Sequence, residues 1–301
     1  MIMDAAKRHH WWPECHSKLW VAKNGLITMI NKEGVAVPVT PENAGVIKHH
    51  NSVRLSNGSV DTSLETYFAD EIENPVAPIL LRLATERFKS AAWDRHIDHD
   101  FARREASGIR QDGFLPIKKG YSVSMPPKDR LATARYFASL LVRVPSYKDE
   151  LKSPKMVAGI QKILGLSEIE AKVETDILHV EIVRQHLQDY ATRLMQCAWI
   201  LIESEKQEII FGDTPIVPSA LGWGEAEAIC PVSPNRCLML VKGYKPPIEN
   251  SIMIVQSLPR SIRALNHTLL QNADRFVFCR SPFPIDFVRT HLGSGPIKML
   301  A

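Results

Sequence analysis

The sequence feature that most constrains the fold is a long helical pattern in the middle of the chain. The segment Ser167-Glu-Ile-Glu170 fits a capping box, in which a serine hydroxyl and a glutamate carboxylate satisfy backbone amides at the start of a helix. Apolar residues then recur at helical spacing nearly to Glu203, at Ile169, Val173, Ile177, Val180, Leu187, Leu194, Ala198 and Leu201. We therefore expect one helix of a length that is unusual in a globular domain.

Shorter helices are predicted on both sides of this segment. Periodic apolar residues indicate helices after Asp61, over residues 128–144 and over residues 259–272. In the first of these, Pro75 and Pro78 are expected to break or kink the helix, because proline lacks the amide that a helix interior uses.

Strands are predicted toward the two ends of the chain. Residues 19–40 fit a hairpin, with turn signals at Asn24-Gly25 and Glu33-Gly34. Short apolar runs after Glu205 suggest an antiparallel meander, and residues 275–279 fit a last strand. Helices in a central region, with antiparallel strands at the N-terminus and in the C-terminal third, predict an α+β fold rather than a doubly wound parallel sheet.

The composition is that of a globular chain. Hydrophobic residues make up 45% and charged residues 23% of the 301 residues, which argues against disorder, collagen and coiled coil. We expect a single domain over residues 1–301, with a weak subdivision near 106–127. The net charge of +4 is spread along the chain, so nucleic acid stays open as a partner although no charge clustering indicates it.

Cysteine usage and targeting signals suggest a compartment. The five cysteines form no CxxC pair, and the N-terminus has no apolar core of signal-peptide length. An apolar run of about 18 residues, as a membrane span requires, is also missing from the sequence. We expect a cytoplasmic protein with reduced thiols and no membrane partner.

The N-terminal block RHHWWPECHSKLW, residues 8–20, is unusual in composition because it holds three histidines, three tryptophans and a cysteine. It resembles the N-terminal signature of an uncharacterised, mainly bacterial domain-of-unknown-function family (DUF4238 type), which opens with His-His-x-x-Pro. His9, His10 and Pro13 match this signature, and Trp20 falls where the family has a later aromatic residue.

Further segments agree in order with blocks of the same family. They contain Glu65 in LETYFAD, Arg143 in Arg-Val-Pro, Asp213 in FGDTP, the Pro231-Val-Ser-Pro234 turn, and Asn266 with Arg275 in the last block. Gly212 stands where the family has a serine, which is a departure from its pattern. The family has no assigned activity, so the resemblance implies a fold unit and candidate positions without a mechanism.

These positions suggest a metal-dependent site. The candidate catalytic residues are His9, His10, Glu65 and Asp213, of which His9, His10 and Asp213 are the candidate ligands of a divalent metal. The candidate substrate-binding residues are Arg143, Arg275 and Asn266. Adjacent residues of an extended chain point to opposite sides, so only one of the two histidines would face a given ion. Structural alternatives stay open: histidines bonded to backbone in a tryptophan-lined corner, an Asx turn at Asp213, and a helix-dipole role for Glu65.

Three rival groups have simpler explanations. His96 with His99-Asp100 is similar to metal phosphohydrolase sites, but a solvated charged helix explains the segment better. His179 and His186, each three residues from an aspartate, are expected to form surface pairs. Cys15 beside His16 suggests a thiolate nucleophile, although sequence neighbours are seldom aimed at each other.

Two functions follow from these observations. The first is a metal-assisted phosphodiester hydrolase, or nuclease-like effector, in which the histidine pair and the carboxylates hold the ion. Basic residues that could face the phosphate are Lys7, Arg8, Lys18, Arg143 and Arg275. The alternative is a non-catalytic binding protein, in which the tryptophan-rich corner (Trp11, Trp12, Trp20) is either a recognition surface or part of the core.

Overall fold

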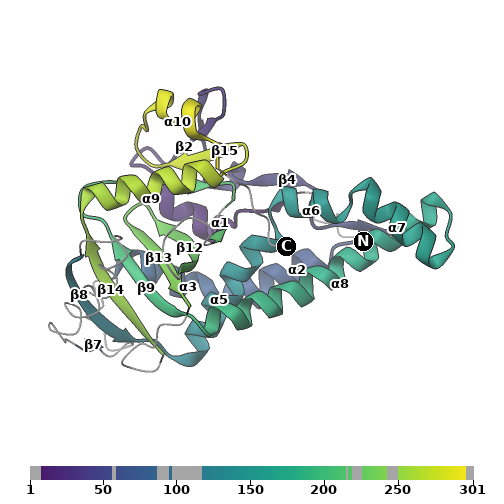
Figure 1. The fold of residues 1–301 in the computed structure, drawn as a ribbon, viewed down its shortest axis with the longest axis horizontal. Helices are drawn as coiled ribbons and strands as arrows, with labels where there is room; N and C mark the ends of the chain where they lie inside the picture. The colour runs from purple at the N-terminus through teal and green to yellow at the C-terminus, as the bar shows by residue number, and fades with distance from the viewer. Residues whose placement is uncertain are drawn as a thin grey trace.

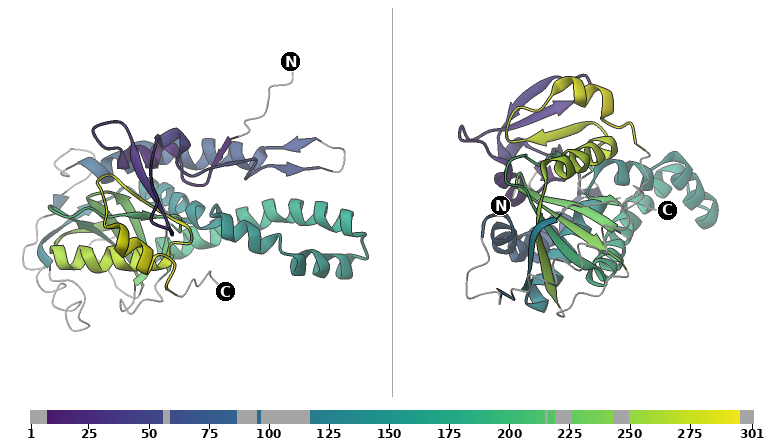
Figure 2. Two further views of the ribbon diagram at one scale, coloured as in Figure 1. Left: turned by 90° about the horizontal axis from the view of Figure 1, so that it is seen from above. Right: turned by 60° about the vertical axis from the view of Figure 1, so that its left-hand side comes forward.

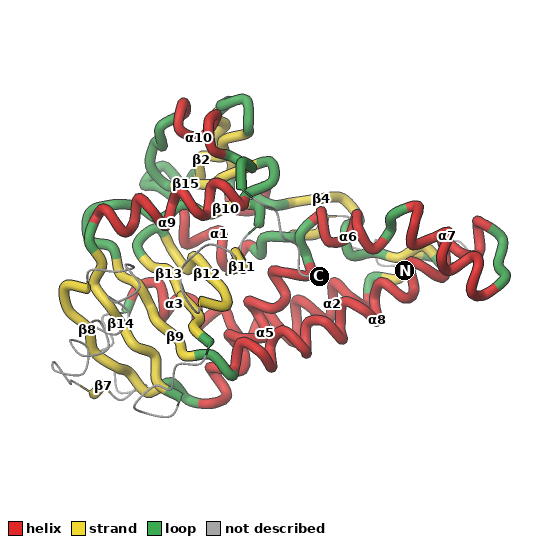
Figure 3. The backbone as a smooth tube through the Cα atoms, viewed as in Figure 1, coloured by secondary structure: helices red, strands yellow, loops and turns green. Residues whose placement is uncertain are grey.

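The computed structural model describes residues 8–55, 59–86, 95–96, 117–214, 216–218, 226–242 and 250–295. Its helices and mainly antiparallel sheets confirm the predicted α+β class (Figure 1, Figure 3). Residues 106–116 of the predicted subdivision lie outside the described ranges, as do His99 and Asp100 and the side chain of His96.

The central layer is a sheet to which the described ranges contribute seven strands. In spatial order these are β11 (Val217–Pro218), β12 (Ala226–Ser233), β13 (Arg236–Val241), β9 (Ala198–Glu203), β14 (Ser251–Ser257), β8 (Ile117–Ser124) and β7 (Arg95–His96). Neighbours run antiparallel except β9 and β14, which are parallel. The predicted antiparallel meander therefore holds for β11, β12 and β13, but not for β14, which lies between β9 and β8.

The central strands of this sheet are buried on both faces, which explains why β9, β13 and β14 are apolar along most of their length. On β9, Trp199 and Leu201 belong to the core under the long helices, whereas Ile200 and Ile202 belong to the core under α9 (Pro259–Asn272). The prediction that the long helix continues nearly to Glu203 is therefore wrong. It ends at Met195, because the apolar residues after it fill both sides of a central strand.

Helices cover one face of the sheet as a layer. The layer consists of α3 (Asn74–Thr85), α5 (Pro127–Val142) and α8 (Glu168–Met195), and α6 (Pro145–Leu151) and α7 (Pro154–Leu164) pack against α8. The capping box predicted at Ser167 is present at the start of α8. The N-terminal half of α8 extends beyond the sheet, with α7 beside it (Figure 2). Within the described ranges, none of the helices is long and apolar enough to cross a membrane.

The predicted kinked helix after Asp61 is one continuous helical stretch with a wide turn inside it. It consists of α2 (Ser63–Tyr67), a π-helical segment η3 (Phe68–Glu73) and α3. Pro75 is the second residue after the π-helical segment and Pro78 lies inside α3, and the helical backbone continues through both. The irregularity thus falls before the prolines rather than at them.

The N-terminal part of the chain combines with the C-terminal part in a second sheet. This sheet has the order β10 (Phe211–Gly212), β15 (Phe276–Cys279), β2 (Ile27–Asn31) and β3 (Ala36–Val39), all antiparallel. Two further small antiparallel pairs are β1 (Arg8–His10) with β4 (Val46–Lys48), and β5 (Val53–Arg54) with β6 (Val60–Asp61), of which β5 contacts α8. The remaining short helices are α1 (Glu14–Ser17), η1 (Lys18–Trp20), η2 (Pro41–Asn43) and α10 (Ile285–His291).

Candidate functional site

The tryptophan-rich corner is part of the core and not a recognition surface. Trp11, Trp12 and Trp20 are buried in one cluster, and the Trp12 ring stacks on Phe211 with 4.1 Å between ring centroids. His16 lies against the same rings and donates from Nε2 to the Val232 carbonyl at 3.1 Å. The recognition-surface version of the binding-protein interpretation is therefore wrong, and the structural version holds for the tryptophans.

The adjoining cysteine is not an activated nucleophile. Burial, with the Glu73 carboxylate as the next cause, raises the pKa of the Cys15 thiol to about 12. Its neighbour His16 is occupied elsewhere, because burial lowers the pKa of that imidazole to about 3 and its Nε2 bonds a carbonyl. A thiolate is stabilised by nearby positive charge or by a base, whereas burial and the Glu73 carboxylate favour the neutral thiol at Cys15.

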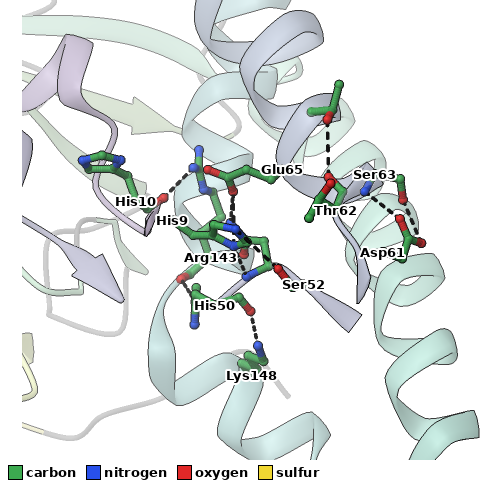
Figure 4. A network of polar contacts seen from close by, with 12 residues as sticks. His9, His10, His50, Ser52, Asp61, Thr62, Ser63, Glu65, Arg143 and Lys148 are labelled. Carbon is green, nitrogen blue, oxygen red and sulfur yellow. Dashed lines mark hydrogen bonds and ion pairs between the residues drawn. The ribbon is translucent and has the colours of Figure 1, made fainter. Parts of the chain in front are cut away.

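His9 is held in the interior by the segment that follows β4. Its side chain is fully buried, and the backbone N–H of Asn51 donates to its Nδ1 at 2.8 Å (Figure 4). The Nδ1 atom therefore carries a lone pair, and the neutral ring carries its proton on Nε2. The Nε2 atom faces the hydroxyl of Ser52 at 3.4 Å.

Asn51 also orients the carboxylate of Glu65. Its side-chain amide donates to Glu65 Oε2 at 2.5 Å, and the same oxygen lies 3.9 Å from His9 Nδ1. The Glu65 side chain is 21% exposed, although His9 and Asn51 beside it are buried. One residue thus fixes a buried imidazole and a carboxylate that reaches solvent.

Arg143 connects the same region to the end of η3. Its guanidinium donates to Glu73 Oε1 at 2.6 Å and to the carbonyl of His10, and it lies 4.4 Å from the centre of the Phe68 ring. The carbonyl of Arg143 in turn accepts a hydrogen bond from His50 Nε2 at 2.8 Å. Arg143 is 1% exposed and shared between two acceptors, so it clamps the site together instead of offering a free cation to a phosphate.

The π-helical segment explains how two carboxylates of one helical stretch reach this region. Residues eight apart in an α-helix differ in direction by about 80°. One extra residue in the wide turn makes them equivalent to residues seven apart, which differ by about 20°. The Glu65 carboxylate accepts from Asn51, which also binds His9. The Glu73 carboxylate accepts from Arg143, which also donates to the carbonyl of His10. Such wide turns are frequent at functional sites.

The other predicted site residues lie elsewhere. His10 bonds from Nε2 to the Glu42 carbonyl at 3.2 Å. The carboxylate of Asp213 accepts the backbone N–H groups of Asp274, Arg275 and Phe276 at 2.7, 2.7 and 3.1 Å. The Asp213 carboxylate therefore caps the turn before β15. In an Asx turn it would bond the backbone of its own loop instead. Burial raises the pKa of Asp213 to about 6, against these three donors, which lower it.

The predicted substrate-binding residues Asn266 and Arg275 belong to the same structural region as Asp213. Asn266 is buried on α9, accepts from the Ile210 amide at 3.1 Å and donates to the Glu208 carbonyl at 2.7 Å. Arg275 is half-exposed and pairs with Asp274 at 3.2 Å. Neither contacts His9 or Glu65.

The predicted three-ligand metal site is not assembled. Across the described ranges, no group of three histidine, cysteine, aspartate or glutamate side chains is placed to hold an ion. The physical reason is local: Asp213 is engaged by three amides, and His9 has its lone pair on Nδ1 already accepting the Asn51 amide. With the proton on Nε2, this imidazole has no further lone pair to offer a metal.

The two histidines of α8 differ from the expected surface pairs. His179 is buried, and His186 contacts the Tyr147 hydroxyl. The expected aspartate partners are engaged elsewhere, Asp176 with Lys152 and Asp189 with Gln185.

Sequence reasoning missed Asn51, Glu73, His50 and Lys148. The sequence did contain a signal for Asn51, because His49-His50-Asn51 repeats the histidine doublet of the N-terminal block. His49 adopts a left-handed backbone conformation, with φ of 54°, which is uncommon outside glycine. Such backbone conformations cluster at functional sites.

The chain belongs to the family described as "Protein of unknown function (DUF4238)", which matches residues 8–282. This match confirms the resemblance inferred from the N-terminal block, and it includes every residue of the site described above. Comparison with curated proteins and with solved structures gives no match.

Proposed function

We propose that this chain hydrolyses phosphodiesters, with Glu65 as the general base that activates the attacking water. The observation that carries the proposal is a carboxylate that reaches solvent while the side-chain amide of the buried Asn51 holds it in place. A base must be positioned within hydrogen-bond reach of the proton that it takes, and a fixed, partly exposed carboxylate meets that requirement.

His9 holds the backbone of Asn51, and through Asn51 it positions this base instead of transferring the proton. Ser52, His9 and Glu65 follow one another as in a serine triad, at 3.4 and 3.9 Å. In such a triad the histidine accepts the serine proton on Nε2. Here Nδ1 accepts the Asn51 amide, so Nε2 already carries a proton and cannot take another from Ser52. The geometry therefore favours direct attack by water over a serine nucleophile.

A negatively charged substrate is favoured by a cation on the neighbouring helix α6. Lys148 donates to the carbonyl of His50, directly before Asn51. Positive groups fixed near the reacting atoms stabilise the charge that develops on a phosphoryl group.

The test is hydrolysis of bis(p-nitrophenyl) phosphate and of labelled single- and double-stranded oligonucleotides. Each substrate is assayed with EDTA, with Mg²⁺ and with Mn²⁺, so that any metal requirement is measured separately from the role of Glu65. The Glu65→Gln variant keeps an oxygen for the Asn51 amide but removes the base, so we expect its rate to fall by about 100-fold or more.

The matched control is Glu168→Gln, which makes the same change on an exposed side chain at the start of α8. Its rate should equal that of the wild type. Absence of turnover by the wild-type protein in every condition, or equal rates for Glu65→Gln and wild type, would overturn the proposal in favour of a non-catalytic binding protein.

A further inference from the structure

We propose that Lys148 on α6 and His179 on α8 form a binding site for a phosphoryl group or a similar tetrahedral oxyanion. The two residues define what we call the Lys148–His179 site. Nothing in this inference depends on hydrolysis at Glu65.

His179 supplies the first observation. The residue is only 4% exposed, and its Nδ1 atom is buried without a hydrogen-bond partner among the described residues. Leaving a buried polar atom unsatisfied costs about 1–3 kcal/mol, so such atoms are normally met by protein, water or ligand. A bound group is therefore expected at Nδ1.

Lys148 supplies the second, independent observation. Its ammonium donates to the carbonyl of His50 (Figure 4), and within the described ranges it forms no ion pair with a carboxylate. The nearby Asp176 is paired with Lys152. An ammonium has three protons to donate, and a partly buried charge without a counter-ion is costly. An anion would satisfy both needs.

The contacts between α6 and α8 place the two groups near each other. Lys152, four residues after Lys148, pairs with Asp176, and Tyr147, next to Lys148, contacts His186, so the part of α8 that contains His179 faces the part of the chain that contains Lys148. Burial, followed by the charges of Lys152, Lys148 and His50, lowers the pKa of the His179 imidazole to about 3. The imidazole therefore stays neutral beside cations and can donate one N–H. Burial and Lys152 lower the pKa of Lys148 to about 8, against Asp176 and Asp149, which raise it. At neutral pH the site offers one ammonium and one neutral imidazole to an oxyanion.

A tetrahedral oxyanion fits this donor set better than a single carboxylate. Two donors of Lys148 remain after its bond to His50, and His179 can add an imidazole N–H from another helix. Several oxygens on one centre can accept from donors in different directions, as phosphate oxygens do when bound by lysine. His50 immediately precedes Asn51, so an anion here would lie next along the chain to the residue that orients Glu65.

The experiment measures binding of inorganic phosphate and of sulfate to the full chain, by calorimetry and by thermal shift, with chloride at equal ionic strength as the reference. We expect both oxyanions to raise the melting temperature beyond the effect of chloride. Lys148→Met should weaken binding about tenfold or more, because a charged hydrogen-bond donor is lost. His179→Phe removes the buried nitrogen at similar volume and should also weaken it; His179→Gln serves if that variant does not fold.

The control is Lys155→Met on α7, an exposed lysine that should leave the affinity unchanged. The charge of the sulfate dianion does not change between about pH 6 and about pH 9. Its affinity should therefore fall as the pH rises through about 8, because Lys148 loses its proton there. Equal effects of sulfate and chloride on the wild type, or equal affinities for Lys148→Met and Lys155→Met, would overturn the proposal.

Discussion

The Arg143 guanidinium donates to Glu73 Oε1 at 2.6 Å while the same group donates to the carbonyl of His10. One buried side chain thereby joins the end of α5, the π-helical segment η3 and the first strand of the chain. The Arg-Val-Pro and His-His-x-x-Pro segments are far apart in sequence, and this contact joins these two family-like blocks directly.

Arg143→Met should destabilise the protein by about 3 kcal/mol, because it leaves Glu73 and the His10 carbonyl without their donor in a mostly dry region. Urea unfolding followed by circular dichroism measures the change. Glu73→Gln keeps an acceptor for the guanidinium and should cost less. Lys172→Met removes an exposed pair with Glu168 and should leave the unfolding midpoint unchanged. Equally small losses of unfolding free energy for Arg143→Met and Lys172→Met would show that the bonds of Arg143 to Glu73 and the His10 carbonyl do not stabilise the protein.

Gly45→Ala should be much more harmful than Gly25→Ala, although both glycines have positive φ, at 66° and 81°. A Cβ atom at Gly45 would lie 2.6 Å from the Trp12 Cβ and 2.9 Å from the Trp12 backbone nitrogen, whereas one at Gly25 would meet nothing within 4 Å. We expect about 1 kcal/mol for the strain at Gly25 and about 3 kcal/mol at Gly45, where packing is also disturbed. Urea unfolding of both variants measures the difference, and equal losses would contradict the close packing of Trp12.

Local signals in the sequence were sufficient for much of the helical architecture. The capping box at Ser167 and Glu170 fixed the start of α8, and the helix over residues 259–272 has the predicted bounds. The end of α8 could not be read in the same way. An apolar run is compatible with a helix or with a strand that is buried on both faces, and only the sheet around β9 decides between them.

The candidate site was predicted in part, for a physical reason. A short motif marks positions whose side chains are constrained, but it does not state whether the constraint is chemical or structural. His9 and Glu65 do come together, through Asn51. Asp213 and Asn266 are just as constrained, yet they satisfy backbone groups around β15 and α9. The π turn that aligns Glu65 with Glu73 has no clear sequence signature, so the second carboxylate could not be assigned.

Asp213→Asn tests the structural role directly. The amide nitrogen would replace one carboxylate oxygen and face a backbone N–H donor, so we expect a loss of about 2 kcal/mol. Phosphodiester turnover per folded molecule should not change. Asp286→Asn on α10, at a fully exposed side chain, is the control and should leave stability unaltered. Loss of turnover by folded Asp213→Asn protein would return Asp213 to the site.

The protein should lose stability as the pH falls below about 6.5. Burial lowers the pKa of His16, His50 and His179 to about 3, 4 and 3. In the unfolded chain these imidazoles gain protons near the ordinary value of about 6.5, so over this range the unfolded state binds more protons and stability rises with pH. Each contributes a loss of about 1.4 kcal/mol between about pH 7.5 and about pH 5.5.

Asp213 opposes this trend. Its pKa is raised to about 6 in the folded protein, so it takes up a proton there before it does in the unfolded chain and adds about 1 kcal/mol at the lower pH. The net loss should therefore be about 3 kcal/mol, measured by urea unfolding at the two pH values. His179→Gln should reduce this loss of stability by about 1.4 kcal/mol, the contribution of one imidazole. Gln188→Ala, on the exposed side of the same helix, should not change it. Equal stability of the wild type at both pH values would show that these imidazoles are not held neutral by burial.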